Sequence, residues 1–138
     1  MATMQVDIVS AEAEIFSGEA EMVIAPSELG AVGIMPGHAQ LLARLRPGEV
    51  QLRTSGQDDQ FFYVSGGILE VQPHVVTVLS DTALRAKDID ESQAQEAKKR
   101  AEDALADKSS DIDYATAQAW LAEAAAQLRV IEHLRKRR

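Results

Sequence analysis

The sequence predicts an all-β N-terminal sandwich or flattened barrel over residues 1–87, followed by an antiparallel α-helical hairpin over residues 88–138. Three observations support this division. All eight glycines and all four prolines lie at or before Pro73, fifteen of the nineteen valines and isoleucines lie in the first part, and the second part holds twelve alanines. Branched side chains with frequent turn residues favour short strands, whereas alanine without helix breakers favours helix.

The first part contains short segments in which apolar residues alternate with polar ones, as expected of half-buried strands. They include Val6 and Ile8, Met22 and Ile24, Leu41–Leu45, Val50–Thr54, Gln60–Ser65, Ile68–Gln72 and Val75–Ser80. Turn residues separate them at Phe16–Gly18, Gly30–Gly33, Pro47-Gly48, Gly66-Gly67 and Pro73-His74. Strands this closely spaced, with no helix between them, imply antiparallel pairing.

The second part carries two helix-start signals. Asp88 with Glu91 resembles a capping box and marks the start of the first helix. Ser110 with Asp113 marks the start of the second helix. The expected inner stripes are Ala94, Ala97, Ala101 and Leu105 on the first helix, and Tyr114, Ala117, Leu121, Ala124, Leu128 and Ile131 on the second. Because alanine dominates this seam, it buries little apolar area, and we expect a hairpin that can detach or repack.

Charge and composition exclude several classes of function. Twenty-two acidic and fourteen basic side chains give a net charge of −8, which repels nucleic acids and anionic lipid headgroups. No apolar run approaches the ~18 residues of a membrane span, so we expect no direct membrane insertion. The absence of cysteine excludes disulfides and thiolate chemistry.

The sequence offers no set of residues for catalysis. His38, His74 and His133 are far apart and show no metal-ligand spacing. The glycine pairs lack the Lys and Ser/Thr of a phosphate-binding loop. We therefore expect a binding or structural protein, not an enzyme, with no metal and no cofactor.

A basic cluster lies near the C-terminus, at Arg129, Arg135, Lys136, Arg137 and Arg138. Cations at the end of a helix complement its dipole, which explains the cluster without any partner. Alternatively, the cluster is a cationic end that docks on an acidic partner.

Several motifs in register resemble the epsilon subunit of F-type ATP synthase. They are Asp7–Glu12, Phe16–Gly18, Gly33–Ala39, Ser65–Val71, Val76–Leu79 with Asp81–Ala83, Asp113–Ala115 and Ala126–Val130. The resemblance implies a β-sandwich of about ten antiparallel strands and a helical hairpin, in agreement with the pattern above.

The same resemblance implies a non-catalytic rotor subunit of the central stalk. Its partners would be the gamma subunit and the c-ring, and it would couple proton translocation to ATP synthesis. The hairpin would extend along the shaft, meet the catalytic alpha and beta subunits and oppose ATP hydrolysis. Such a subunit is held by the complex at the cytoplasmic face of the bacterial inner membrane.

Carried over to this sequence, the resemblance assigns two contact regions. Ser27, Glu28, Leu29, Gly30, Ala31 and Val32 resemble the loop that faces the c-ring, although a plain β-turn explains them equally. Ala31 stands where bacterial relatives often carry an acidic residue, so Glu28 would have to supply the charge. His38, Ala39 and Leu42 resemble the face that meets the gamma shaft.

The segment from Ile89 to Glu102 resembles the ATP-sensing motif of the family, in which an Asp and two arginines contact nucleotide. Asp90 and Arg100 match, but Gln93 replaces the first arginine. A neutral amide lacks the charge-assisted, forked contact of a guanidinium with phosphate. We therefore expect weak or absent nucleotide binding, with Asp90 and Arg100 serving as helix-surface residues.

A different class of function is also compatible with the pattern. A free-standing adaptor could bind a peptide at a sheet edge and dimerise through its helical hairpin. Such an adaptor would be a dimer in solution, whereas the rotor subunit would copurify with a membrane-bound ATPase.

Overall fold

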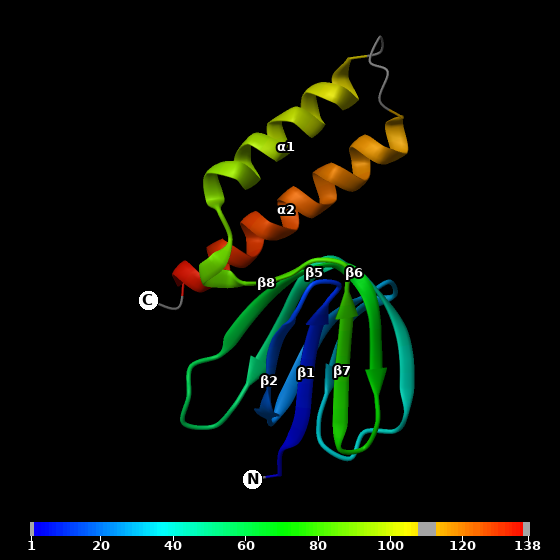
Figure 1. Ribbon diagram of the computed structural model, residues 1–138, viewed down its shortest axis with the longest axis vertical. Helices are drawn as coiled ribbons and strands as arrows, with labels where there is room; N and C mark the ends of the chain where they lie inside the picture. Colours follow the sequence, from blue (N-terminus) through cyan, green and yellow to red (C-terminus); the bar gives the residue numbers. More distant parts are fainter. Residues whose placement is uncertain (1, 108–112, 137–138) are drawn as a thin grey trace.

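The computed structural model describes residues 2–107 and 113–136. Within these residues, eight strands form a β-sandwich and two antiparallel α-helices lie across one end of it (Figure 1). The strands are β1 (Met4–Ser10), β2 (Glu14–Ala20), β3 (Met22–Ser27), β4 (Gly30–Ile34), β5 (Leu41–Arg53), β6 (Gln60–Val71), β7 (Val75–Ser80) and β8 (Ala83–Arg85). The short 3-10 helix η1 (Ala86–Asp88), α1 (Glu91–Ala106) and α2 (Tyr114–Lys136) follow. This arrangement confirms the predicted fold class.

The strands follow the order β2-β1-β7-β6-β5-β3-β4, with β8 paired to β6. Most neighbours are antiparallel, but β1 and β7 are parallel, with Val6 opposite Val76 and Ile8 opposite Val78. The prediction of purely antiparallel pairing is therefore wrong at this position. The two strands are far apart in sequence, so no tight turn fixes their relative direction.

Two predicted turns lie inside long strands. Pro47 pairs with Ser65 within the continuous β5–β6 ladder, so β5 is one strand rather than two. Gly66 and Gly67 lie within β6, with φ angles of 113° and 129°. A Cβ on Gly67 would lie 1.9 Å from the carbonyl oxygen of Leu79. Glycine here lets β6 bend closely against β7 without ending, and these mergers reduce the implied ten or so strands to eight.

Two further turn predictions are wrong, because Phe16–Gly18 lies in β2 and Gly30–Gly33 in β4. The turn before β2 instead forms at Ser10, whose hydroxyl accepts hydrogen bonds from the amides of Glu12 and Ala13 at 3.3 and 3.2 Å. A serine hydroxyl that binds the following amides stabilises a turn without glycine.

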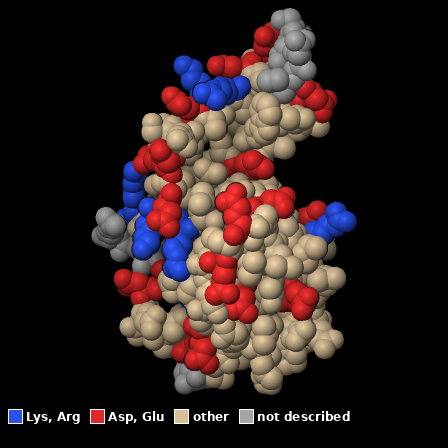
Figure 2. Space-filling model, in the orientation of Figure 1, with Lys and Arg blue, Asp and Glu red and all other residues tan. Residues whose placement is uncertain are grey.

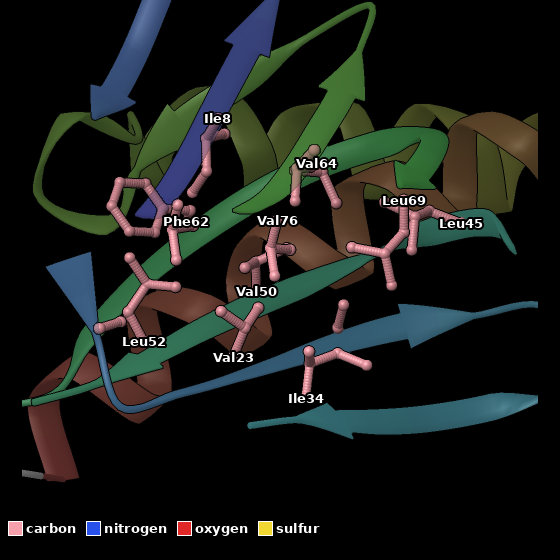
Figure 3. Packing of buried hydrophobic residues seen from close by; sticks show 14 of the residues in the cluster. Ile8, Val23, Ile34, Leu45, Val50, Leu52, Phe62, Val64, Leu69 and Val76 are labelled. Carbon is pink, nitrogen blue, oxygen red and sulfur yellow. The ribbon is translucent and has the colours of Figure 1, made fainter. Parts of the chain in front are cut away.

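The main core lies between the two layers of the sandwich (Figure 3). Its large, fully buried side chains include Ile8, Ile34, Leu52, Phe62, Val64, Leu69 and Val76. In β3 the residues that join the main core are Val23 and Ala25, whereas Met22 and Ile24, the predicted pair, are only partly buried. Both faces of this strand are apolar, so its sequence does not reveal which face is inner.

The first helix begins at Glu91 with its N-cap at Asp90, two residues later than the predicted cap at Asp88. Asp90 is the N-cap residue, and its carboxylate accepts a hydrogen bond from the amide of Gln93 at 3.1 Å. Asp88 belongs to η1 instead, because the chain makes one 3-10 turn after β8 before it enters the helix. The second predicted cap, Ser110, lies outside the described residues.

The hairpin has an alanine seam and a second contact with the sandwich. Ala94 and Ala101 of α1 are buried, as are Ala117 and Ala124 of α2. Ala97 and Tyr114 are exposed, so the prediction that they are inner residues is wrong. A second buried cluster joins α2 to the sandwich and consists of Phe61, Tyr63, Ala86, Ile89, Ala126, Val130 and Ile131. We call this group the docking cluster.

Candidate functional site

The loop predicted to face the c-ring is the tight turn between β3 and β4. Ser27 and Gly30 lie opposite each other at the ends of the two strands, and the Ser27 hydroxyl donates a hydrogen bond to the Gly30 carbonyl at 2.5 Å. Gly30 has a φ of 125°, which few other residues adopt. Leu29 at the tip is 100% exposed, and Glu28 and Ala31 are exposed beside it. Val32 packs against the main core and anchors the hairpin.

The residues predicted to face the gamma shaft lie between β4 and β5 and at the start of β5. His38 is partly buried, and its Nδ1 lies 2.6 Å from the carbonyl oxygen of Ala39. Ala39 is exposed, and Leu42 is 70% exposed. The amide of Gly37 donates to the carbonyl of Pro73 at 2.8 Å, which ties this loop to the β6–β7 turn.

Leu42 belongs to a larger exposed apolar surface on the outer face of β5, β6, β7 and β1. Ile68 pairs with Leu79, Leu79 pairs with Val9, and Leu42 pairs with Glu70, diagonally beside Ile68. Ile68 and Leu79 are each 43% exposed. We call Val9, Leu42, Ile68 and Leu79 the apolar strip.

Sequence reasoning missed Ile68 and Leu79 as surface residues. Their signal is the alternation within each strand, because both adjoin buried Leu69 and Val78 and must point outward. A shallow groove of about 330 Å³ runs beside them. Exposed apolar residues that adjoin across strands are typical of interaction surfaces.

The described part of the basic cluster is engaged within the chain. Arg135 forms an ion pair with Glu91 at the start of α1, and Lys136 lies 3.3 Å from Glu132 of its own helix. Arg129 is close enough to Glu49 of β5 to stabilise its charge. Arg137 and Arg138 lie outside the described residues.

A polar contact beside the docking cluster joins α2 to the sandwich. The Nδ1 of His133 lies 2.7 Å from a carboxylate oxygen of Glu49, and its ring lies 6.1 Å from that of Phe61. Burial raises the pKa of Glu49, and this effect exceeds the opposing influence of His133 and Arg129. The contact helps to position α2 over the sheet.

Tyr63 lies at the centre of the docking cluster. Its hydroxyl is hydrogen-bonded to Gln127 of α2. Burial, with a smaller contribution from the charge of Glu123, raises the pKa of Tyr63 to about 12. The phenol therefore stays neutral throughout the physiological pH range.

A groove of about 760 Å³ lies between α1 and α2. Asp90, Gln93 and Arg100, the three residues of the resembling nucleotide motif, all line it. The carboxylate of Asp90 already caps α1. Acidic residues contribute most of the charge around the groove, and Figure 2 shows acidic side chains on the hairpin as well as on the sandwich. We call this space the hairpin groove.

Among residues 2–107 and 113–136, no group of three or more His, Asp or Glu side chains is arranged to hold a metal ion. Within the same ranges, neither helix combines the length and the hydropathy that a membrane crossing requires.

Two protein-family models match the chain in succession. The ATP synthase delta/epsilon chain beta-sandwich domain matches residues 3–86, and the ATP synthase delta/epsilon chain long alpha-helix domain matches residues 87–132. The chain belongs to the ATP synthase epsilon family. Among curated proteins of this family, ATP synthase epsilon chain 1 of Methylococcus capsulatus is 63% identical over 99% of this chain and 97% of its own length. The ATP synthase epsilon chain of Nitrosococcus oceani is 65% identical over 98% and 96%, respectively.

Two solved structures extend the agreement to the fold. A chain of the Euglena gracilis mitochondrial ATP synthase, from an OSCP/F1/c-ring structure, matches with a TM-score of 0.70 at 20% identity, over 99% of this chain and 81% of that one. A chain from the central stalk and c-ring of the Tetrahymena thermophila enzyme matches with a TM-score of 0.61 at 15% identity, over 94% and 97%. Membership of the epsilon family agrees with the prediction of a non-catalytic subunit.

Proposed function

We propose that this epsilon-family protein is a rotor subunit of a bacterial F-type ATP synthase, which couples proton translocation to ATP synthesis. Its partners are the gamma subunit and the c-ring. The match to chains of solved central-stalk and c-ring assemblies supports this proposal. The observation that carries it is the apolar strip, an exposed surface on an otherwise well-packed sandwich of this family.

Residues 1–87 act as the rotor-binding part of the chain. The apolar strip extends the surface of His38, Ala39 and Leu42, and together they meet the gamma subunit. Burial of an apolar face against a partner provides the main free energy of such an association.

The β3–β4 turn meets the c-ring. Leu29 projects fully into solvent from a hairpin whose own hydrogen bonds are satisfied, so it can enter an apolar site on a partner without disturbing the fold. Glu28 provides the carboxylate beside it, since Ala31 carries no charge.

Residues 88–138 act as a regulatory hairpin that restrains ATP hydrolysis when it leaves the sandwich. In the docked state Arg129 and Arg135 face Glu49 and Glu91 of the same chain. Release of the hairpin from the sandwich frees Arg129, and separation of α2 from α1 frees Arg135, for acidic groups on the catalytic alpha and beta subunits. Deletion of residues 88–138 is expected to raise hydrolysis by the assembled complex and to leave assembly intact.

The protein is held at the cytoplasmic face of the bacterial inner membrane through the complex. The bacterial sources of the curated relatives support this location. The chain would reach the membrane surface through its partner subunits rather than through a span of its own.

Charge substitution in the apolar strip tests the proposal. Ile68→Glu is expected to weaken binding to the gamma subunit by at least about tenfold, because a carboxylate must then be buried in the interface. The matched control is Gln57→Glu, in the turn that joins β5 to β6, at the other end of β6 from Ile68. Binding can be measured by copurification from solubilised membranes and by titration with purified gamma subunit. Equal affinity of the Ile68→Glu variant and the control would refute the assigned surface.

A further inference from the structure

The hairpin groove combines an apolar lining with carboxylates. Leu84, Ala94, Ala97, Ala124 and Trp120 provide the apolar part, and Trp120 is 45% exposed. The alanines leave space between the helices that larger side chains would fill. The volume of about 760 Å³ is within the usual range for sites that hold a small organic molecule.

The charge around the hairpin groove is unbalanced. Its lining contains the carboxylates Asp88, Asp90, Asp103 and Glu123, but only one cation, Arg100, which gives a net charge of −3. Asp90 is occupied as the helix cap, whereas Asp88, Asp103 and Glu123 form no ion pair with any residue that the structure describes. Partial burial raises the pKa of Glu123, because its ionised form is poorly solvated.

This arrangement disfavours anions and favours cations. A nucleotide polyphosphate would meet one guanidinium and several carboxylates, so close approach of its phosphates is repelled. An ammonium group, in contrast, pairs with the exposed carboxylates of Asp88 and Asp103 and restores to the partly buried Glu123 the solvation that burial removes. The face of Trp120 adds a further attraction for a cation, since indole is the strongest of the aromatic partners.

We propose that the hairpin groove binds a small organic polycation with a methylene spine, that is, a polyamine. Its methylene groups cover the alanines and Trp120, while its ammonium groups lie against Asp103, Glu123 and Asp88. The net charge of −8 on the whole chain adds a long-range attraction of the same sign. The groove is complete within one chain, so binding requires no other subunit.

The chain provides its own reporter for this site, because Trp120 is its only tryptophan. Spermidine is titrated into the full-length protein, and tryptophan fluorescence and calorimetry are recorded at constant ionic strength. We expect a saturable change with one molecule bound per chain. Asp103→Asn and Glu123→Gln should each weaken binding by about tenfold, the usual loss when a charge-assisted contact is removed. Glu102→Gln, adjacent on α1, exposed and outside the groove, is the matched control and should leave affinity unchanged.

Three results would overturn the proposal. The first is the absence of saturable binding, and the second is an equal loss of affinity in Glu102→Gln, which would show only diffuse attraction to an acidic protein. The third is tighter binding of ATP than of spermidine in a parallel titration. Circular dichroism of each variant verifies that the helices remain folded. Because these measurements use the isolated chain, they are independent of any role in the central stalk.

Discussion

Replacement of Val130 with alanine should loosen the contact between α2 and the sandwich. Val130 is fully buried in the docking cluster. Removing two carbon atoms from such a site costs about 2 kcal/mol, from the lost burial of roughly 0.8 kcal/mol per carbon and the cavity that remains. A change of this size shifts the equilibrium between docked and undocked α2 by about 30-fold.

The matched control is Val78→Ala, which removes the same atoms from an equally buried position in the main core. Native-state hydrogen exchange separates the two variants. In Val130→Ala the amides of α2 should exchange about 30-fold faster through local opening, while those of β1 and β7 keep their protection. In Val78→Ala local opening of α2 should be unchanged. Equal exchange of α2 in both variants would refute the reasoning that the docking cluster holds the hairpin.

Three further outcomes are expected. In a spectrophotometric titration, Tyr63→Phe should abolish the tyrosine ionisation with a midpoint of about pH 12, and a step near pH 12 that persists in the variant would contradict this assignment. Because the phenol of the unfolded chain ionises at a lower pH, the stability of the wild type should also fall as the pH rises above about 10. Burial raises the pKa of Glu49 above its ordinary value of 4.5. The stabilisation linked to this shift is therefore complete below about pH 4.5 and is lost as the pH rises through the pKa of the folded state. In urea unfolding between about pH 4 and 7, the free energy of unfolding should decline less in Glu49→Gln than in the wild type. Gly67→Ala should destabilise the sandwich far more than Gly56→Ala, because a Cβ at Gly67 meets the Leu79 carbonyl oxygen at 1.9 Å whereas nothing lies within 4 Å at Gly56. Thermal melts compare the two variants, and an equal fall in melting temperature would show that only the positive φ of the glycine matters.

The fold could be predicted because composition and periodicity report local preferences. The change from glycine, proline and branched residues to alanine near Asp88 predicts a transition from strand to helix, and in the structure this transition lies between Arg85 and Glu91. The seam residues Ala117 and Ala124 followed from helical spacing. Ala126 and Val130 did not, because helical spacing indicates one apolar stripe, whereas α2 is buried against both α1 and the sandwich.

The run Phe61-Phe62-Tyr63-Val64 contained a signal for this second contact. Four consecutive apolar residues cannot all face one core from a strand, so an uninterrupted run indicates burial on both faces. In the structure Phe62 and Val64 face the main core, and Phe61 and Tyr63 face the docking cluster. The apolar strip was harder to predict, because the pairing of Ile68 with Leu79 and of Leu79 with Val9 depends on strand register, which the sequence leaves open.

The two-sided burial of α2 has a consequence for any state in which the hairpin leaves the sheet. Lifting the helix would bare a phenyl and a phenol ring to water, and it would separate the Tyr63 hydroxyl from Gln127. An extended form of the isolated chain is therefore unfavourable in solution. It becomes favourable only where a neighbouring subunit provides an apolar surface for α2 and also covers Phe61 and Tyr63.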